Sequence, residues 1–291
     1  MISYKFTSMP IRKLATILCF CLGLPALSQA GGFLSAEDAG IITAGTVGIF
    51  VLGHHVKKLD STKTPLISGP ILFDRKLQRF LGGDCSADKT NFLDSEFGSA
   101  VTPVSAALIM LSADLKWPMS GKSERGQLVA QNLFLYSAGL FATKGITDLT
   151  KGIVARPRPL PCLEPELAGL RTNIDHAYDH NSFFSGHASS AFFAMTFLNK
   201  RIRAIMRNEM TVAEYDKYSW VSPAVSFSWA TFVGWTRIHA YKHFPTDIIA
   251  SAAAGILMAE LFYSFNDFDI PQPPTTQPQP IRPLFSIRLT F

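Results

Sequence analysis

Ser185, Gly186 and His187 stand directly before an apolar, alanine-rich run whose pattern predicts a helix. A serine alone would cap such a helix, because its hydroxyl accepts a hydrogen bond from a free backbone N–H group. Glycine additionally lets an anion approach the main chain at the positive end of the helix dipole, and histidine can transfer a proton near neutral pH. The triplet alone is also typical of an ordinary capped helix, so the rest of the chain must decide its meaning.

A second group of ionisable residues follows the predicted helix 128–142. The stretch KGIVARPRP contains Lys151, Arg156 and Arg158 beside two prolines. Basic residues at the end of a helix complement its dipole, so this group also has an ordinary structural explanation.

A third group precedes another small-residue helix. In the stretch GWTRIHAYKHFPTD, Arg237, His243 and Asp247 are separated by five and then three residues. An aspartate in a first helical turn is common, and a single histidine usually has a packing role. The three groups together nevertheless form an ordered pattern over about 100 residues: Lys-x6-Arg-Pro, Ser-Gly-His and Arg-x5-His-x3-Asp.

In this pattern the sequence resembles the type 2 phosphatidic acid phosphatase superfamily, which also includes bacterial acid phosphatases and vanadate haloperoxidases. The resemblance covers about residues 128–261. Phe184 stands where the family usually has proline, and Thr236 stands where it usually has serine. Neither position supplies an attacking or protonating group, so the departures concern loop geometry. The resemblance implies an all-α helical bundle and a phosphatase.

The resemblance also implies a set of phosphate-binding residues. A phosphate ester carries negative charge that repels a nucleophile, and its transition state spreads charge over the equatorial oxygens, so several fixed cations are needed. Arginine can grip two oxygens at once. The implied phosphate-binding residues are Lys151, Arg158, Ser185, Gly186 and Arg237.

Catalytic roles follow from the same resemblance. His243 is expected to be the nucleophile, with its other ring nitrogen held by Asp247 four residues further on. His187 is expected to protonate the leaving group and later to activate water. No metal or cofactor is implied. The cluster DHAYDH, which includes His176 and His180, lacks a convincing third ligand for a metal.

Six apolar stretches indicate the helices that must position these residues. Most are shorter than the roughly 20 residues of a bilayer crossing, which favours a globular bundle over membrane spans, although the apolar composition keeps an integral membrane protein open. Residues 57–97 are predicted to form loops with short helices, and residues 158–184 form a second irregular stretch that is a candidate substrate-facing loop. The apolar stretches are 40–53, 101–113, 128–142, 188–198, 221–235 and 248–265.

The domain organisation predicted from the sequence has four parts. Residues 1–30 have the pattern of a secretory signal peptide, with a first transmembrane anchor as the alternative. Residues 31–270 form the helical domain, 271–283 a proline-rich linker, and 284–291 a strand-like tail that can dock on another chain or remain unpaired. The expected location is periplasmic or otherwise exported, in soluble or membrane-associated form.

The net charge of the chain argues against a nucleic-acid partner, and its cysteines leave two alternatives open. The leader holds three of the 27 basic residues and none of the 22 acidic ones, so the remainder carries a net charge of only +2, which does not predict a nucleic-acid surface. Cys85 and Cys162 are either one disulfide or two free thiols.

The leading functional hypothesis is a metal-independent phosphatase that acts through a phosphohistidine. Its substrate is a lipid phosphate, an isoprenoid diphosphate or a small phosphomonoester. A vanadate-dependent haloperoxidase and a noncatalytic anion-binding protein are the alternatives.

Overall fold

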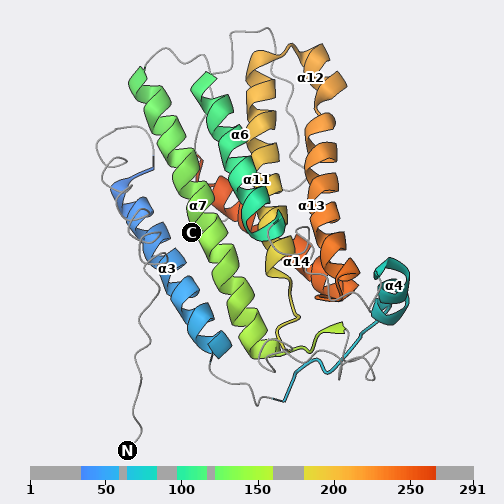
Figure 1. The fold of residues 1–291 in the computed structure, drawn as a ribbon. Coiled ribbons are helices and arrows are strands. Elements are labelled where there is room, and N and C mark those ends of the chain that lie inside the picture. The colour runs from blue at the N-terminus through green and yellow to red at the C-terminus, as the bar shows by residue number, and fades with distance from the viewer. Residues whose placement is uncertain (1–33, 59–63, 84–96, 117–121, 160–179, 267–291) are drawn as a thin grey trace, which may run out of the picture.

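The computed structural model describes residues 34–58, 64–83, 97–116, 122–159 and 180–266, and in these ranges every regular element is helical (Figure 1). This confirms the predicted all-α architecture for the described part. The expected leader, proline-rich linker and strand-like tail lie outside the described residues. In chain order the elements are α3 (Ala36–Lys58), α4 (Asp74–Leu81), the single π-helical turn η1 (Phe97–Val101), α6 (Thr102–Lys116), α7 (Lys122–Val154), α11 (Gly186–Glu209), α12 (Val212–Tyr218), α13 (Val221–His239) and α14 (Pro245–Tyr263).

Helix α11 is the centre of the bundle and packs against α6, α7, α13 and α14. Its residues Ala188, Ala191 and Ala194 are fully buried and leave room for a neighbouring backbone. The closest approach is at Gly255 of α14, where a Cβ atom would lie 2.4 Å from the carbonyl oxygen of Ser189. Further along α11, the rings of Phe193 and Phe197 pack against Tyr136 of α7, with ring centroids 5.6 and 5.4 Å from that of Tyr136.

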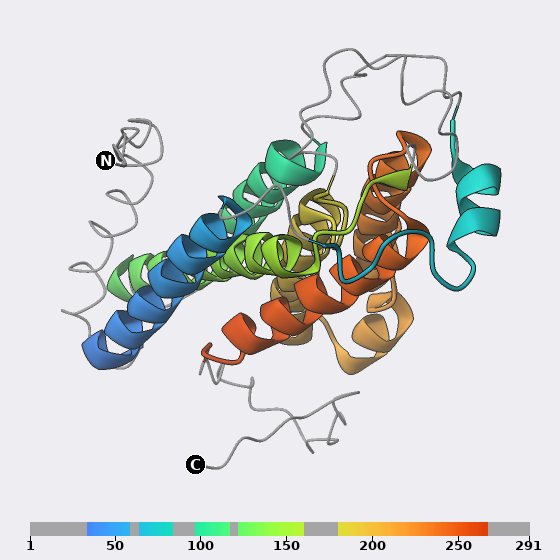
Figure 2. The same ribbon diagram turned by 90° about the horizontal axis from the view of Figure 1, so that it is seen from below.

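Helix α3 lies along α7 on one side of the bundle, as Figures 1 and 2 both show. Glycines permit this contact. A Cβ atom on Gly53 would lie 2.1 Å from the carbonyl oxygen of Gly145, so neither helix tolerates a side chain there. Residue Lys57, near the end of α3, donates to Asp148 of α7 at 3.0 Å.

Two helices are much longer than their apolar stretches predicted. The expected helix 128–142 extends to Val154 in α7, and the expected helix 188–198 extends to Glu209 in α11. The expectation that Lys151 follows the first of these helices is therefore wrong, because Lys151 lies in its last turn. The apolar pattern ends early because the last turns of α7 carry the polar Thr147, Asp148 and Lys151.

Three helices are long enough and apolar enough to cross a membrane: Ala36–Lys58, Gly98–Lys116 and Pro245–Tyr263. The expectation that most apolar stretches fall short of a bilayer crossing is wrong for these three, because each helix extends beyond its apolar core. Their outer faces carry exposed apolar side chains, which fits membrane association. Those side chains are Ile41, Val51 and Leu52 on α3, Val104, Leu108, Ile109 and Leu115 on α6, and Ile249, Leu257 and Leu261 on α14.

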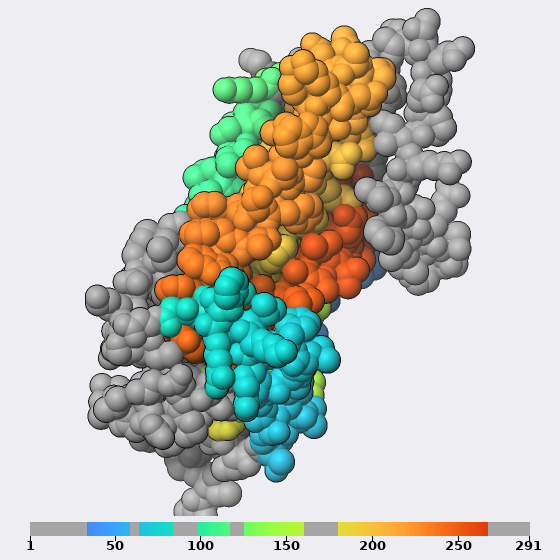
Figure 3. Space-filling model, turned by 90° about the vertical axis from the view of Figure 1, so that its right-hand side faces the viewer, coloured from blue at the N-terminus to red at the C-terminus, as the bar shows by residue number. Residues whose placement is uncertain are grey.

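The segment 64–83, which contains α4, packs against the end of α13 and the start of α14. In the space-filling view it covers this end of both helices (Figure 3). The end of α7 and the start of α11 lie at the same end of the bundle (Figure 1). This end therefore gathers the three motifs singled out in the sequence.

Candidate active site

The C-terminus of α7 turns sharply into the first motif. Ala155 adopts the left-handed conformation with φ of 49°, and its N–H donates to the carbonyl oxygen of Lys151 at 3.0 Å. The chain then leaves the helix before Pro157, which cannot continue it. This turn places Arg156 and Arg158, both buried, beyond the end of the helix that carries Lys151.

The N-terminus of α11 presents the second motif to Lys151. Ser185 is the N-cap, and its hydroxyl accepts from the N–H of Ala188 at 3.4 Å. A Cβ atom at Gly186 would lie 3.9 Å from Nζ of Lys151. The absence of a side chain at Gly186 thus leaves the ammonium group beside the positive end of the helix, an arrangement suited to an anion.

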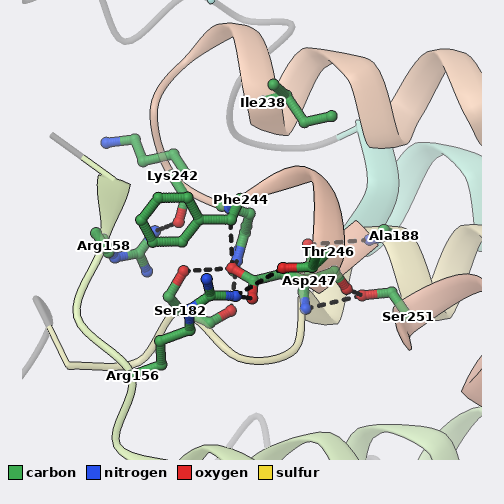
Figure 4. A network of polar contacts seen from close by, with 12 residues as sticks. Arg156, Arg158, Ser182, Ala188, Ile238, Lys242, Phe244, Thr246, Asp247 and Ser251 are labelled. Carbon is green, nitrogen blue, oxygen red and sulfur yellow. Dashed lines mark hydrogen bonds and ion pairs between the residues drawn. The ribbon is translucent and has the colours of Figure 1, made fainter. Parts of the chain in front are cut away.

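The starts of α11 and α14 are joined by one serine. The N–H of Ser185 donates to Oγ of Ser251 at 2.8 Å, and Oγ of Ser251 donates to the carbonyl oxygen of Asp247 at 2.6 Å (Figure 4). The second and third motifs are therefore fixed relative to each other by buried hydrogen bonds.

The third motif begins in the last turn of α13, continues through the loop and ends in the first turn of α14. The carbonyl oxygen of Arg237 accepts from the N–H groups of Lys242 and His243 at 3.1 and 3.3 Å. The side chain of Arg158 reaches the same loop, where its Nη1 donates to the carbonyl oxygen of Lys242 at 2.8 Å. Arg158 and Arg237 are each only 4% exposed, so both guanidinium groups are held within the protein.

The ring of His243 has a defined orientation. Its Nδ1 atom lies 2.6 Å from the carbonyl oxygen of Ser182. Because a carbonyl oxygen can only accept, the hydrogen bond requires a proton on Nδ1, and the neutral ring then has its lone pair on Nε2. The arrangement prepares Nε2 for attack on an electrophile.

The charge of His243 is disfavoured by its surroundings. Burial of the ring, followed by the nearby cations Arg158, Lys151 and Arg237, lowers the pKa of His243 well below its ordinary value. His187 acts on the ring in the same direction. These residues from three separate motifs therefore lie close enough to influence one another, and they favour the neutral form of His243.

Lys151 experiences the same concentration of positive charge. Burial and the neighbouring Arg158, Lys57 and Lys144 lower the pKa of Lys151 well below its ordinary value, while Asp148 opposes the shift. A bound anion would relieve this repulsion, which is a further indication that the site accepts negative charge.

His187 follows the N-cap of α11 and is partly exposed. Its backbone and Cβ are packed against Gly98 of η1, where a Cβ atom would lie 2.6 Å from Cβ of His187. The glycine thus fixes how far His187 stands from the turn that precedes α6.

Asp247 has a different environment from the one expected. Its Oδ2 lies 3.7 Å from Nδ1 of His243, beyond hydrogen-bond distance. Oδ2 instead accepts from Oγ of Ser182 at 2.5 Å and from the N–H of Phe244 at 2.9 Å, and Oδ1 accepts from Arg156 at 2.5 Å (Figure 4). The carbonyl of Ser182, and not the carboxylate, contacts the ring directly.

All eight residues implied by the resemblance are therefore found at one end of the bundle. They lie in the last turn of α7 and the segment that follows it, at the start of α11, in the last turn of α13, in the α13–α14 loop and in the first turn of α14. The ion pair between Arg156 and Asp74, which are both fully buried, was not predicted from the sequence. Arg156 was visible as a second arginine in its motif, but Asp74 gave no signal. Among the described residues no group of three metal-ligating side chains occurs, and residues 175–179 of the DHAYDH cluster lie outside the described part.

The three motifs lie within the part of the chain that matches a known protein family. Residues 132–270 match the PAP2 superfamily. Human phospholipid phosphatase 2 is 27% identical over 163 residues, which are 48% of this chain and 52% of that protein. The phospholipid phosphatase 2 proteins of Bos taurus and Rattus norvegicus are each 27% identical, over 50% and 54% of this chain and 54% and 62% of their own lengths. The chain thus spans little more than half the length of these relatives. No solved structure matches it.

Proposed function

Because residues 132–270 of this chain match the PAP2 superfamily, we propose that the protein is a phosphatase that hydrolyses phosphate monoesters through a phosphohistidine intermediate. The observation that carries the proposal is the state of His243. Its ring is buried among cations, its Nδ1 is bonded to the carbonyl oxygen of Ser182, and its Nε2 is left unprotonated. A neutral imidazole in a cationic site can attack a phosphorus atom that is itself negatively surrounded.

The phosphate group is held by cations and by the start of α11. Lys151, Arg158 and Arg237 neutralise its oxygens, and the backbone of Gly186 together with the hydroxyl of Ser185 completes the binding site. Because these side chains are fixed before substrate arrives, they stabilise the charge that develops on the equatorial oxygens without reorganisation.

The reaction proceeds in two displacements. Nε2 of His243 forms a bond to phosphorus while the bond from phosphorus to the leaving oxygen breaks, and His187 gives its proton to that oxygen. His187 then takes a proton from water, the resulting hydroxide bonds to phosphorus, and the phosphorus–nitrogen bond breaks. Inorganic phosphate leaves, and His243 returns to its neutral form. Asp247 holds the loop on which His243 lies, through its bonds to Ser182 and Phe244.

We assign lipid phosphates as the substrate class. Three helices are long enough and apolar enough to cross a bilayer. The site lies at one end of the bundle to which these helices belong. The relatives named above are phospholipid phosphatases by name. A lipid whose headgroup ends in a phosphate monoester would reach the cations from the bilayer surface.

The test is phosphate release from phosphatidate in detergent micelles by the purified chain. We expect turnover that survives EDTA, since the cations of the site are side chains, and that vanadate inhibits. Arg158→Ala should lose most of the activity, whereas Arg203→Ala, on α11 and bonded to Tyr215, should keep it. Loss of activity on chelation with recovery on adding a divalent metal would contradict this mechanism. Bromide oxidation with peroxide and vanadate, without phosphate release, would indicate a haloperoxidase instead.

A further inference from the structure

Arg156 lies within the first motif but is not available to a phosphate. It is 0% exposed, and its five N–H bonds are all directed to protein oxygens. Nη1 donates to Asp247 Oδ1 at 2.5 Å and to Thr246 Oγ1 at 2.9 Å. Nη2 donates to Asp74 Oδ2 at 2.6 Å and to the carbonyl oxygen of Gly69 at 2.8 Å, and Nε donates to the same carbonyl at 3.1 Å.

Asp74 completes this network from outside the matched family segment. It begins α4 and is 0% exposed. Its Oδ1 accepts from the N–H of Thr246 at 2.9 Å, and its Oδ2 accepts from Oγ1 of Thr246 at 2.7 Å as well as from Arg156. Asp74 therefore binds both the arginine and the first turn of α14.

The remainder of the segment 64–83 is hydrogen-bonded to the last turn of α13, which leads into the loop that carries His243. Nε2 of Gln78 donates to the carbonyl oxygen of Ile238 at 2.7 Å, and the N–H of Gly83 donates to the carbonyl oxygen of His239 at 2.9 Å. Gly82 allows this approach, because a Cβ there would lie 2.5 Å from the hydroxyl of Tyr241. The segment thus holds both ends of the α13–α14 loop.

We propose that Asp74 and Arg156 are positioning residues for the nucleophile, and that segment 64–83 is a working part of the active centre. Asp74 fixes Arg156, Arg156 fixes Asp247, and Asp247 fixes Ser182, whose carbonyl oxygen orients His243. The proposal rests on the proposed function. It adds that formation of the phosphoenzyme depends on the contact between Arg156 and Asp74, which are 82 residues apart in the sequence.

The test separates positioning from stability. Asp74→Asn keeps the shape but removes the charge that holds Arg156. We expect kcat for p-nitrophenyl phosphate to fall about tenfold or more. The inhibition constant for inorganic phosphate should stay within about threefold, because Lys151, Arg158 and Arg237 are untouched. The matched control is Asp114→Asn, which breaks another buried ion pair, with Arg201, on α6 and α11. It should lower thermal stability without changing kcat of the folded protein.

A milder pair of variants covers the case in which Asp74→Asn does not fold. Thr246→Val removes the hydroxyl that joins Asp74 to Arg156, and Thr143→Val removes a buried hydroxyl that bonds only within α7. We expect kcat to fall in the first and not in the second, with the phosphate inhibition constant unchanged in both. An unchanged kcat in Asp74→Asn or Thr246→Val, or equal losses in kcat and phosphate affinity, would overturn the proposal. If the unaltered protein forms no phosphohistidine, the proposed function itself fails.

Discussion

The carbonyl oxygen of Ser182 lies 2.6 Å from Nδ1 of His243, whereas the nearest carboxylate oxygen of Asp247 lies 3.7 Å from the same nitrogen. The backbone therefore selects the tautomer of His243, the proposed nucleophile. Asp247 acts one step further back, since its Oδ2 accepts from Oγ of Ser182 at 2.5 Å. Substitution of a side chain does not remove a main-chain carbonyl oxygen, so the hydrogen bond to Nδ1 of His243 should remain when Asp247 is replaced.

Asp247→Asn should weaken catalysis less than loss of a carboxylate that touches its histidine. In serine proteases such a loss lowers kcat about 10⁴-fold, because the ring takes the wrong tautomer. Here the carbonyl of Ser182 still selects the tautomer, so we expect a decrease of about 10- to 100-fold. Steady-state kinetics with an aryl phosphate measures it. A decrease near 10⁴-fold would show that Asp247 contacts the ring directly during the reaction.

The pKa of His243 should be measurably low in the phosphate-free protein. Burial and the neighbouring cations favour the neutral ring, so protonation should occur only below the ordinary value of about 6.5. Removing the first of these cations in Arg158→Gln should raise the titration midpoint. NMR titration of labelled histidines gives both values, with Arg203→Gln as the control. A midpoint at or above 6.5 in the unaltered protein, or a lower one in Arg158→Gln, would contradict the electrostatic account.

Gly98→Ala should impair the step that depends on His187. A Cβ atom at position 98 would lie 2.6 Å from Cβ of His187, so the histidine or the turn η1 must move. A displacement of about 1 Å can lower the rate about 10²-fold, and we expect at least a tenfold loss for an alkyl phosphate. Gly126→Ala is the matched control, since nothing lies within 4 Å of its added carbon. Equal activities of the two variants would show that His187 needs no such support.

Membrane insertion predicts unequal effects of lysine on two exposed apolar positions. Leu108, on the candidate span Gly98–Lys116, is 58% exposed, and Val212, on α12 outside the spans, is 73% exposed. In a bilayer a lysine at a span costs about 2.5 to 3.5 kcal/mol, whereas an exposed site in water tolerates it. Leu108→Lys should therefore reduce the amount of protein in carbonate-washed membranes, and Val212→Lys should not. Full recovery of the unaltered protein without detergent would contradict a membrane-spanning bundle.

The three motifs singled out in the sequence lie together at one end of the bundle (Figure 1), whereas the lengths of the helices that carry them were predicted less well. The motif residues lie within short stretches at helix ends, so their types and spacing could be read directly. Helix lengths were underestimated because α7 and α11 continue through polar turns. Asp74 could not be predicted, because its partners Arg156 and Thr246 are 82 and 172 residues away and meet it only in the folded chain. The contact between the carbonyl oxygen of Ser182 and His243 could not be predicted either, because every residue has a carbonyl group.

The most direct test of the central claim is rapid quenching of the unaltered protein, His243→Ala and His187→Ala with labelled substrate. The account predicts acid-labile phosphate on histidine in the unaltered protein and none in His243→Ala on any ester. His187→Ala should still be phosphorylated by an activated aryl ester such as p-nitrophenyl phosphate. It should lose about 10²–10⁴-fold with an alkyl ester, whose leaving oxygen needs the proton. Phosphohistidine in His243→Ala, or equal impairment of His187→Ala with alkyl and aryl esters, would contradict the assignment of nucleophile and acid.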